Sequence, residues 1–401
     1  MTPIRSVSTP HALVPTLPGE RPPGTWRYSS RIALALSGGG ARAAYQVGVL
    51  QGLAERLPGL EFPILTGVSA GAINTAFLAA HLGDFSTAVE QLRQRWTTLT
   101  AERIYDVHTG TLIRAVLSNI TRGVVGRRSR KTLHGLVDTA PLREFLRETI
   151  RIEGIDSNIA TGRLRAAALS ATSYTTGRSV TFVHAPAGTP MWERAQRVSV
   201  AVSLTIDHIM ASAALPIVFP AICVDGEFYG DGSISHLAPL APALHLGARA
   251  IVAIGPPVAH PTQPAVARYP NAAQVLGLVF RAIFLDALEA DAERLERVNR
   301  TLAGIPPGAP QPGGLHPVEL LMIRPSRELD SLAVGQTRLL PTPIRWVVRA
   351  LGGQRKEAAE FLGHLLFHPT HTGPLMELGY RDVSAQWPAM ERFFEKLTRA
   401  E

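Results

Sequence analysis

The chain has 401 residues, of which 46% are hydrophobic and 18% are charged, an ordinary globular composition. Its net charge of +8 suits acidic partners such as anionic lipid, but charge does not determine a fold. The single cysteine, Cys223, excludes a disulfide framework and fits a reducing compartment. No uninterrupted apolar run reaches the roughly 18 residues that would predict a membrane-spanning helix. We therefore expect a cytoplasmic protein with a large α/β core.

The first residues, 1–30, are rich in proline and lack an apolar run, so we expect a flexible leader without a signal-peptide core. Residues 31–37 (RIALALS) predict a buried strand, and Gly38-Gly39-Gly40 follows at once. Residues 41–57 carry apolar side chains at four-residue steps, which predicts an amphipathic helix.

A second strand–helix unit is expected around Gly67-Val68-Ser69-Ala70-Gly71, which has the pattern G-x-S-x-G. The apolar residues 63–66 precede it, and an alanine-rich helix over 72–80 follows. In this context a serine side chain stands clear of the backbone, and the amides after it lie at a helix N-terminus that favours negative charge. The same residues also suit a purely structural turn, so the pattern by itself leaves both interpretations open.

The remaining elements up to residue 255 alternate between helices and strands. We expect, in order, a helix over 84–99, strands over 164–170 and 179–184, a small-residue helix over 209–220 ended by proline, a hairpin over 223–235 and a strand over 250–255. Such alternation predicts a three-layer α/β/α domain with a mainly parallel central sheet. We place this catalytic domain at 31–255.

Residues 256–401 differ in character and predict a mixed, mostly helical C-terminal extension packed on the catalytic domain. Helices are expected over 275–302 and 340–357, and a strand over 318–323. Within the catalytic domain, residues 107–137 contain six basic residues and no acidic one, which predicts a solvated basic loop or a surface for phosphate headgroups.

Three motifs have the composition needed for acyl transfer: Gly38-Gly39-Gly40-Ala41-Arg42, the serine elbow, and Asp231-Gly232-Ser233. Successive glycine amides can converge on one anion, and in comparable sites one oxyanion donor contributes about 3–4 kcal/mol. Arg42 adds a positive charge or holds the loop. Asp231 is a candidate base for Ser69 if burial raises its pKa from about 3.9.

Two other interpretations use parts of the same motifs. Gly38-x-Gly40-x-x-Ala43 matches a dinucleotide-binding fingerprint, but Glu61 precedes the second strand instead of ending it, and the serine elbow stays unexplained. A serine–histidine–aspartate triad would need an imidazole after Asp231. The candidates for that imidazole are His236, His245 and His260.

Over roughly residues 31–250 the chain resembles the patatin-like phospholipases, which are acyl hydrolases with a Ser–Asp dyad. The three motifs and the block Ala211-Ser212-Ala213-Ala214-Leu215-Pro216 with Phe219-Pro220 carry this resemblance. It implies that Ser69 is the nucleophile and Asp231 the base. It also implies an oxyanion hole made by Gly38, Gly39, Gly40, Arg42 and the amide of Ala70, with Gly67, Gly71, Gly232 and Ser233 as motif residues. The chain departs from the family at Ala43, where glycine is usual, and at Ser233, where glycine or alanine is usual.

The expected function is therefore that of a lipid acyl hydrolase, of the phospholipase A, lysophospholipase or esterase type, acting in lipid catabolism without cofactor or metal. Phospholipid or another acyl-ester lipid is the expected partner, with peripheral contact to an anionic membrane and no nucleic acid. A non-catalytic lipid-binding regulatory protein is the alternative, and a dinucleotide binder is a weaker one. The histidines His364, His368 and His371 are spaced like ligands, but Pro369 interrupts them, so no metal site is expected.

Overall fold

The computed structural model describes residues 31–107, 135–235, 237–255, 286–306, 313, 315–333, 335–342, 344–345 and 363–399. The expected leader, nearly all of the basic segment, His236, His260 and most of the helix expected over 340–357 lie outside these ranges.

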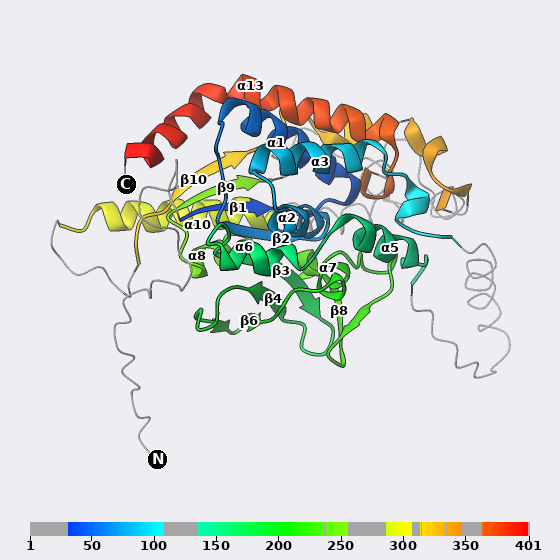
Figure 1. The fold of residues 1–401 in the computed structure, drawn as a ribbon, viewed down its shortest axis with the longest axis horizontal. Helices are drawn as coiled ribbons and strands as arrows, with labels where there is room; N and C mark the ends of the chain where they lie inside the picture. Colours follow the sequence, from blue (N-terminus) through cyan, green and yellow to red (C-terminus); the bar gives the residue numbers. More distant parts are fainter. Residues whose placement is uncertain are drawn as a thin grey trace, which may run out of the picture.

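The described residues form a ten-stranded mixed sheet at the centre of the molecule (Figure 1). Its parallel half runs in the order β10 (Glu319–Ile323), β9 (Ala250–Ile254), β1 (Ile32–Leu36), β2 (Ile64–Val68) and β3 (Ala166–Ser173). The remaining strands are β4 (Ser179–His184), β5 (Glu193–Arg194), β6 (Arg197–Ala201), β7 (Ile222–Val224) and β8 (Glu227–Asp231). β1, β2, β3 and β9 are buried along their whole length, which explains their continuous small and apolar sequences.

Side chains alternate between two cores, one on each face of the sheet, as the strand periodicity requires. Ile32, Leu34 and Leu36 of β1 belong to the larger core, whereas Ala33 and Ala35 belong to the smaller one. The larger core is covered by α1 (Ala44–Arg56), α2 (Ala70–Ala80), α3 (Phe85–Thr97) and α13 (Pro369–Arg399), and the smaller core by α8 (Ala241–His245) and α10 (Asp286–Ala303). The fold is therefore a three-layer α/β/α structure with a mostly parallel sheet, as expected from the sequence.

Shorter helices also lie beside the sheet, two of them before β3 in the chain and one after β6. These are α5 (Ala140–Thr149), α6 (Gly154–Ala160) and α7 (Ile206–Ser212). The expectation of a helix over 209–220 was wrong at both ends. α7 begins earlier, where the Thr205 amide donates to Nδ1 of His208 at 3.0 Å. It ends four residues before Pro216, whose ring disfavours a helical conformation in the residue before it.

Parts of the C-terminal region belong to the same body as the glycine and serine motifs. β10 pairs in parallel with β9, and α13 lies along α1 (Figure 1). Glycines permit this close helix contact, since a Cβ on Gly48 would lie 1.8 Å from the Met376 carbonyl oxygen. The Tyr45 hydroxyl also donates to Oδ2 of Asp382 at 3.0 Å. α13 therefore fixes α1, the helix that follows the glycine motif.

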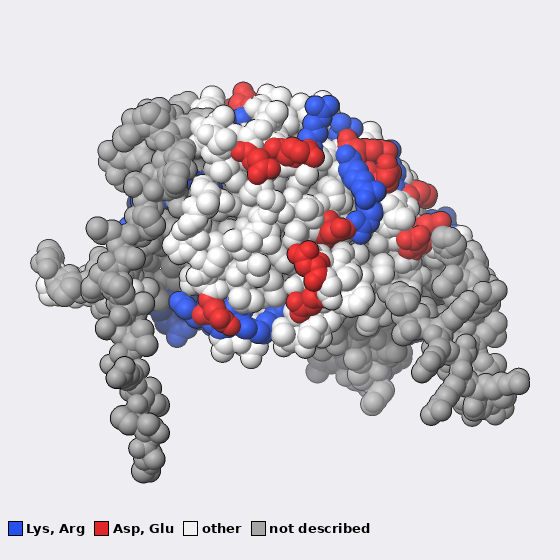
Figure 2. All heavy atoms as spheres, turned by 60° about the horizontal axis from the view of Figure 1, so that its bottom comes forward, with Lys and Arg blue, Asp and Glu red and all other residues white. Residues whose placement is uncertain are grey.

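Among the described residues, every helix is too short or too polar to cross a lipid bilayer. On the face seen in Figure 2, acidic and basic side chains lie interspersed around a broad uncharged area. The positive net charge therefore forms no continuous basic patch over the described part of this face.

Candidate active site

Two strands that approach from opposite directions bring Ser69 and Asp231 together. β2 runs parallel to β3 and ends with Val68 opposite Ser170. β8 runs antiparallel to β3 and ends with Asp231 opposite Ala171, the next residue along β3. Because both strands lie along β3 and end at adjacent positions, the residue after β2 meets the last residue of β8.

Ser69 occupies a sharp turn between β2 and α2 and has a φ of 56°, which is unusual for a residue other than glycine. Such a conformation costs on the order of 1–3 kcal/mol and is retained only where its surroundings enforce it. The flanking glycines permit the tight turn. A Cβ on Gly71 would lie 2.4 Å from the Ser37 carbonyl oxygen, and one on Gly67 would lie 2.3 Å from Oγ1 of Thr75. The G-x-S-x-G pattern thus forms the strand–turn–helix elbow expected from the sequence.

Asp231 is fully buried at the end of β8. Its Oδ1 accepts a hydrogen bond from the Ser233 amide at 2.9 Å, and within the described residues Oδ2 has no hydrogen-bond partner. Burial raises the pKa of Asp231 to about 6, and the adjacent side chain of Ser69 and the amide of Ser233 oppose this rise. The carboxylate is therefore charged at neutral pH and weakly solvated, which suits a proton acceptor.

Gly232 lets the Asp231 turn pack directly on β3. A Cβ at this position would lie 2.1 Å from the Ser170 carbonyl oxygen and 2.6 Å from Cγ2 of Val68. Thr172 further fixes the turn by donating from Oγ1 to the Asp231 carbonyl at 2.9 Å. Any larger residue at 232 would push the carboxylate away from the serine elbow.

The residues Gly38–Arg42, which we call the glycine loop, connect β1 with α1. Gly39 has a φ of 152° and Gly40 a φ of 57°, both in the region that favours glycine. Within the described residues, the amides of Gly38 and Gly39 donate no hydrogen bond to the protein. Arg42 is buried, and the pKa of His364 and that of His371 are lowered by burial and, to a smaller extent, by the Arg42 charge.

Ser212 is a site residue whose role the sequence did not indicate. Its Oγ accepts a hydrogen bond from the Ser69 amide at 3.0 Å and donates one to the Ser170 carbonyl at 2.6 Å. The side chain is completely buried at the end of α7. It therefore ties the strained elbow to β3. Its place in the small-residue block before Pro216 was the only sequence signal for it.

Substitution of Ser212 by alanine should destabilise the fold by about 1–3 kcal/mol, because it leaves the buried Ser69 amide without an acceptor. Urea unfolding of the variant and the parent protein measures this difference. Ser331→Ala, which removes an exposed hydroxyl that donates to the Glu328 carbonyl, serves as the control and should change stability by less than about 0.5 kcal/mol. Equal stability of Ser212→Ala and the parent would contradict the proposed anchoring.

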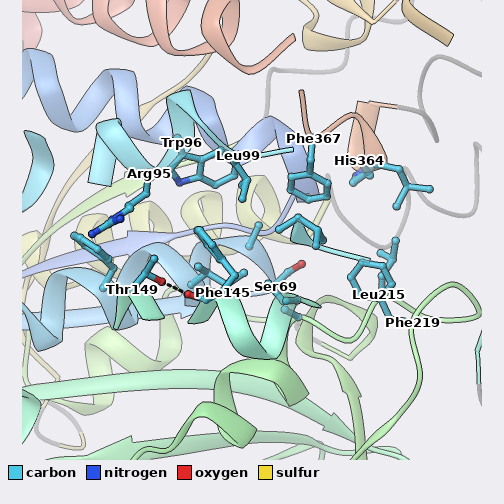
Figure 3. Close-up of a pocket in the computed structure, with 18 of the residues that line it drawn as sticks. Ser69, Arg95, Trp96, Leu99, Phe145, Thr149, Leu215, Phe219, His364 and Phe367 are labelled. Atoms are coloured by element: carbon cyan, nitrogen blue, oxygen red, sulfur yellow. Dashed lines mark hydrogen bonds between the residues drawn. The ribbon is translucent and has the colours of Figure 1, made fainter. Parts of the chain in front are cut away.

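An apolar pocket opens beside Ser69 (Figure 3). Its walls come from α2, α3, α5 and the segment after α7, through Ile73, Phe77, Leu92, Trp96, Leu142, Phe145, Leu215 and Phe219. In Figure 3 the pocket runs from Ser69 toward Arg95 and Thr149 on one side and toward His364 on the other. A lining of this kind can enclose a hydrocarbon chain but offers few polar partners.

The C-terminal region completes this pocket, which the sequence did not predict. His364, Leu365 and Phe367 line it together with Ser69 and Gly40. A Cβ on Gly40 would lie 2.2 Å from the His364 carbonyl oxygen, so the C-terminal segment packs directly on the glycine loop. Tyr105 holds the segment in place by donating from its hydroxyl to the Leu365 carbonyl at 3.0 Å.

Of the three triad candidates only His245 is described, and it stacks on Trp192 in the smaller core. Glu61 lies before β2 and pairs with Arg163 at 3.5 Å, so it is not at the strand end where a ribose-binding acid belongs. Within the described ranges no three histidine, cysteine or acidic residues gather as a metal-binding group.

Comparisons with known proteins point to one family. Residues 34–244, just over half of the chain, match the family profile described as patatin-like phospholipase. A search of curated proteins finds no match.

Among solved structures, VipD from Legionella pneumophila is 15% identical, with 87% of this chain and 67% of that chain covered and a TM-score of 0.29. Human GIVD cytosolic phospholipase A2 is 12% identical, with 92% and 60% covered and a TM-score of 0.44. The type III effector protein ExoU of Pseudomonas aeruginosa is 13% identical, with 83% and 53% covered and a TM-score of 0.30. The chain thus spans between 53% and 67% of the length of these proteins.

Proposed function

The chain belongs to the patatin-like phospholipase family, and we propose that it hydrolyses carboxylic esters of lipids through an acyl-enzyme formed on Ser69. Family membership supports lipid hydrolysis as the general activity. The observation that carries the finer proposal is the meeting of β2 and β8 on adjacent residues of β3, which sets the Ser69 elbow against the buried Asp231 carboxylate.

In the proposed reaction Asp231 accepts the hydroxyl proton of Ser69 as Oγ attacks the ester carbonyl. The resulting oxyanion is held by amides of the glycine loop and of Ala70 at the start of α2, where the helix dipole also favours negative charge. Collapse of this intermediate breaks the ester bond, and the leaving alcohol takes the proton from Asp231. Water, which gives a proton to Asp231, then attacks the acyl-enzyme, releases the fatty acid and restores the serine.

The apolar pocket supports an acyl chain as the part of the substrate that binds next to Ser69. Most of its wall residues are aliphatic or aromatic, and burial of such surface is worth about 25 cal/mol per Å². The alcohol part of the ester would lie beside Leu215, Phe219 and His364, which line the pocket on the other side of Ser69. We propose a phospholipid or another acyl-ester lipid as the substrate, reached by peripheral contact with a membrane.

The test is the reaction of the purified protein with a fluorophosphonate probe, followed by identification of the labelled residue and by fatty-acid release from phospholipid and glyceride substrates. We expect labelling at Ser69 together with ester hydrolysis. Lipid binding without labelling or turnover would instead favour the non-catalytic lipid-binding protein. Thermal stabilisation by NAD would favour the dinucleotide binder. Complete loss of activity in a folded His236→Ala variant would replace the dyad by a triad.

Turnover should also depend on pH in a direction that the Asp231 environment sets. Because its pKa is raised to about 6, the carboxyl is protonated and inactive as a base at pH 5 and ionised at pH 7. We expect kcat/KM on a neutral soluble ester to rise about tenfold per pH unit below the pKa and to level off above about pH 7. Activity that is flat from pH 4 to 8 would contradict Asp231 as the base.

A further inference from the structure

A buried series of side-chain hydrogen bonds links the apolar pocket with the glycine loop. Trp96, in the last turn of α3, donates from Nε1 to Oδ1 of Asn74 at 2.9 Å. Nδ2 of Asn74 donates to Oε1 of Gln46 at 3.0 Å. Gln46 in turn donates from Nε2 to the Ser37 carbonyl at 2.7 Å. The series therefore begins at a residue of the pocket wall and ends at the residue directly before the glycine loop.

The series holds both ends of this loop to the helix that follows Ser69. Asn74 lies on α2, five residues after the serine, and its Nδ2 also donates to the Ala43 carbonyl at 3.4 Å. Ser37 precedes the loop and Ala43 follows it. The distance between the nucleophile and the loop amides is thus set by two amide side chains, each of which acts as donor and acceptor at once.

These side chains have no freedom to rearrange in solvent, because Gln46, Asn74 and Trp96 are 3%, 0% and 4% exposed. Buried hydrogen bonds of this kind are strong, and leaving one partner unpaired is costly. The Trp96 ring also lines the apolar pocket and lies 6.4 Å, centre to centre, from the ring of Phe367. An acyl chain in the pocket would therefore pack against the indole whose N–H starts the series.

We propose that Trp96, Asn74 and Gln46 are positioning residues that hold the glycine loop at the distance from Ser69 that oxyanion binding requires, and that acyl-chain packing on Trp96 reinforces this geometry. The proposal rests on the proposed function of the site. Oxyanion donors act over 2.7–3.1 Å, and a misplacement of about 1 Å can cost about 100-fold in rate. The series should therefore influence kcat more than KM.

Two substitutions remove links of the series. Gln46→Met, of similar volume, removes the donor to Ser37 and the acceptor for Asn74, and the smaller side chain of Trp96→Phe lacks the indole N–H but keeps an aromatic wall. On p-nitrophenyl butyrate and p-nitrophenyl laurate we expect kcat to fall about tenfold or more for Gln46→Met and about three- to tenfold for Trp96→Phe, with KM within about twofold. The double variant should lose little more than Gln46→Met, because both changes break one series.

Matched controls separate positioning from general destabilisation. Gln51→Met lies on the same helix with its amide bonded to Glu55 at the surface, and Trp192→Phe changes a buried tryptophan of the smaller core. Both should keep kcat within about twofold even if stability falls. Losses that multiply in the double variant, or that appear only in KM, would overturn the proposal.

Hydrogen exchange of the segment 37–44 provides a readout that needs no turnover. We expect faster exchange in Trp96→Phe than in the parent protein and in Trp192→Phe. Unchanged exchange would overturn the positioning role, whatever the activity. If the parent protein hydrolysed no ester but this segment still exchanged faster in Trp96→Phe, the proposed function would fail while the structural link between the pocket and the loop would stand.

Discussion

Replacement of Ser69 by alanine is expected to reduce ester hydrolysis by about 10⁴-fold or more, because no other group at the elbow can form the acyl-enzyme. The change should leave the fold intact. Alanine differs from serine by one oxygen, and both residues have a Cβ, so the backbone strain at a φ of 56° is the same in the variant and in the parent protein. Release of fatty acid measures the loss, and the fluorophosphonate label should disappear with it.

The control for this variant is Ser331→Ala, which makes the same chemical change at an exposed position of the 3-10 helix Leu329–Leu332 and should retain full activity. Thermal unfolding of Ser69→Ala establishes that the loss is chemical. Residual activity above about 1% in a folded Ser69→Ala variant would show that another residue is the nucleophile, and the labelled peptide would then identify it.

The local features of the site could be predicted because they are written in short stretches of sequence. A run of apolar residues followed by glycines and a small-residue helix predicts both β1 with the glycine loop and β2 with the elbow around Ser69. The hairpin β7–β8 follows from Asp225-Gly226, whose residues have φ values of 50° and 83°. In each case the conformation is decided within a few residues.

Features that depend on distant parts of the chain could not be predicted in this way. The meeting of Ser69 with Asp231 was expected only through the family resemblance, because it follows from the register of two strands on β3, which periodicity does not reveal. Ser212 acts through a hydrogen bond to an amide 143 positions earlier in the chain. The sequence also gave no sign that the segment around His364 would pack on Gly40 and line the pocket.

Helix ends were predicted less well than helix positions. The small residues before Pro216 continue a helical composition, so the sequence alone places the end of α7 too late. The Thr205 cap and the buried contact of Ser212 with Ser170 determine where the helix begins and ends. Similarly, Pro369 suggested a break, whereas it is the first residue of α13, a position where its missing N–H costs nothing.

Replacement of Asp231 by asparagine is expected to reduce hydrolysis by about 10³-fold or more, because an amide of the same shape cannot accept the Ser69 proton. Its oxygen can still take the hydrogen bond from the Ser233 amide, so the turn after β8 should persist. The loss should appear in kcat on soluble and lipid esters alike. Near-normal turnover by Asp231→Asn would exclude the aspartate as the base.

Asp231→Asn should also stabilise the fold at neutral pH. This gain in stability is expected if Asp231 is a poorly solvated base, and a loss is expected if its charge has a structural role. The pKa of Asp231 is raised from 3.8 to about 6 in the folded protein, so the folded state binds the proton more tightly than the unfolded state. The contribution of this group to stability is then fully present below about pH 4 and is lost as pH rises to about 6. At pH 8 the ionised carboxylate costs about 2–3 kcal/mol of folding stability, which asparagine avoids.

Urea unfolding of both proteins at pH 4 and pH 8 should show similar stabilities at the lower pH and a more stable variant at the higher pH. A variant less stable than the parent at pH 8 would mean that the charged carboxylate is stabilised by partners, and would contradict its role as a poorly solvated base.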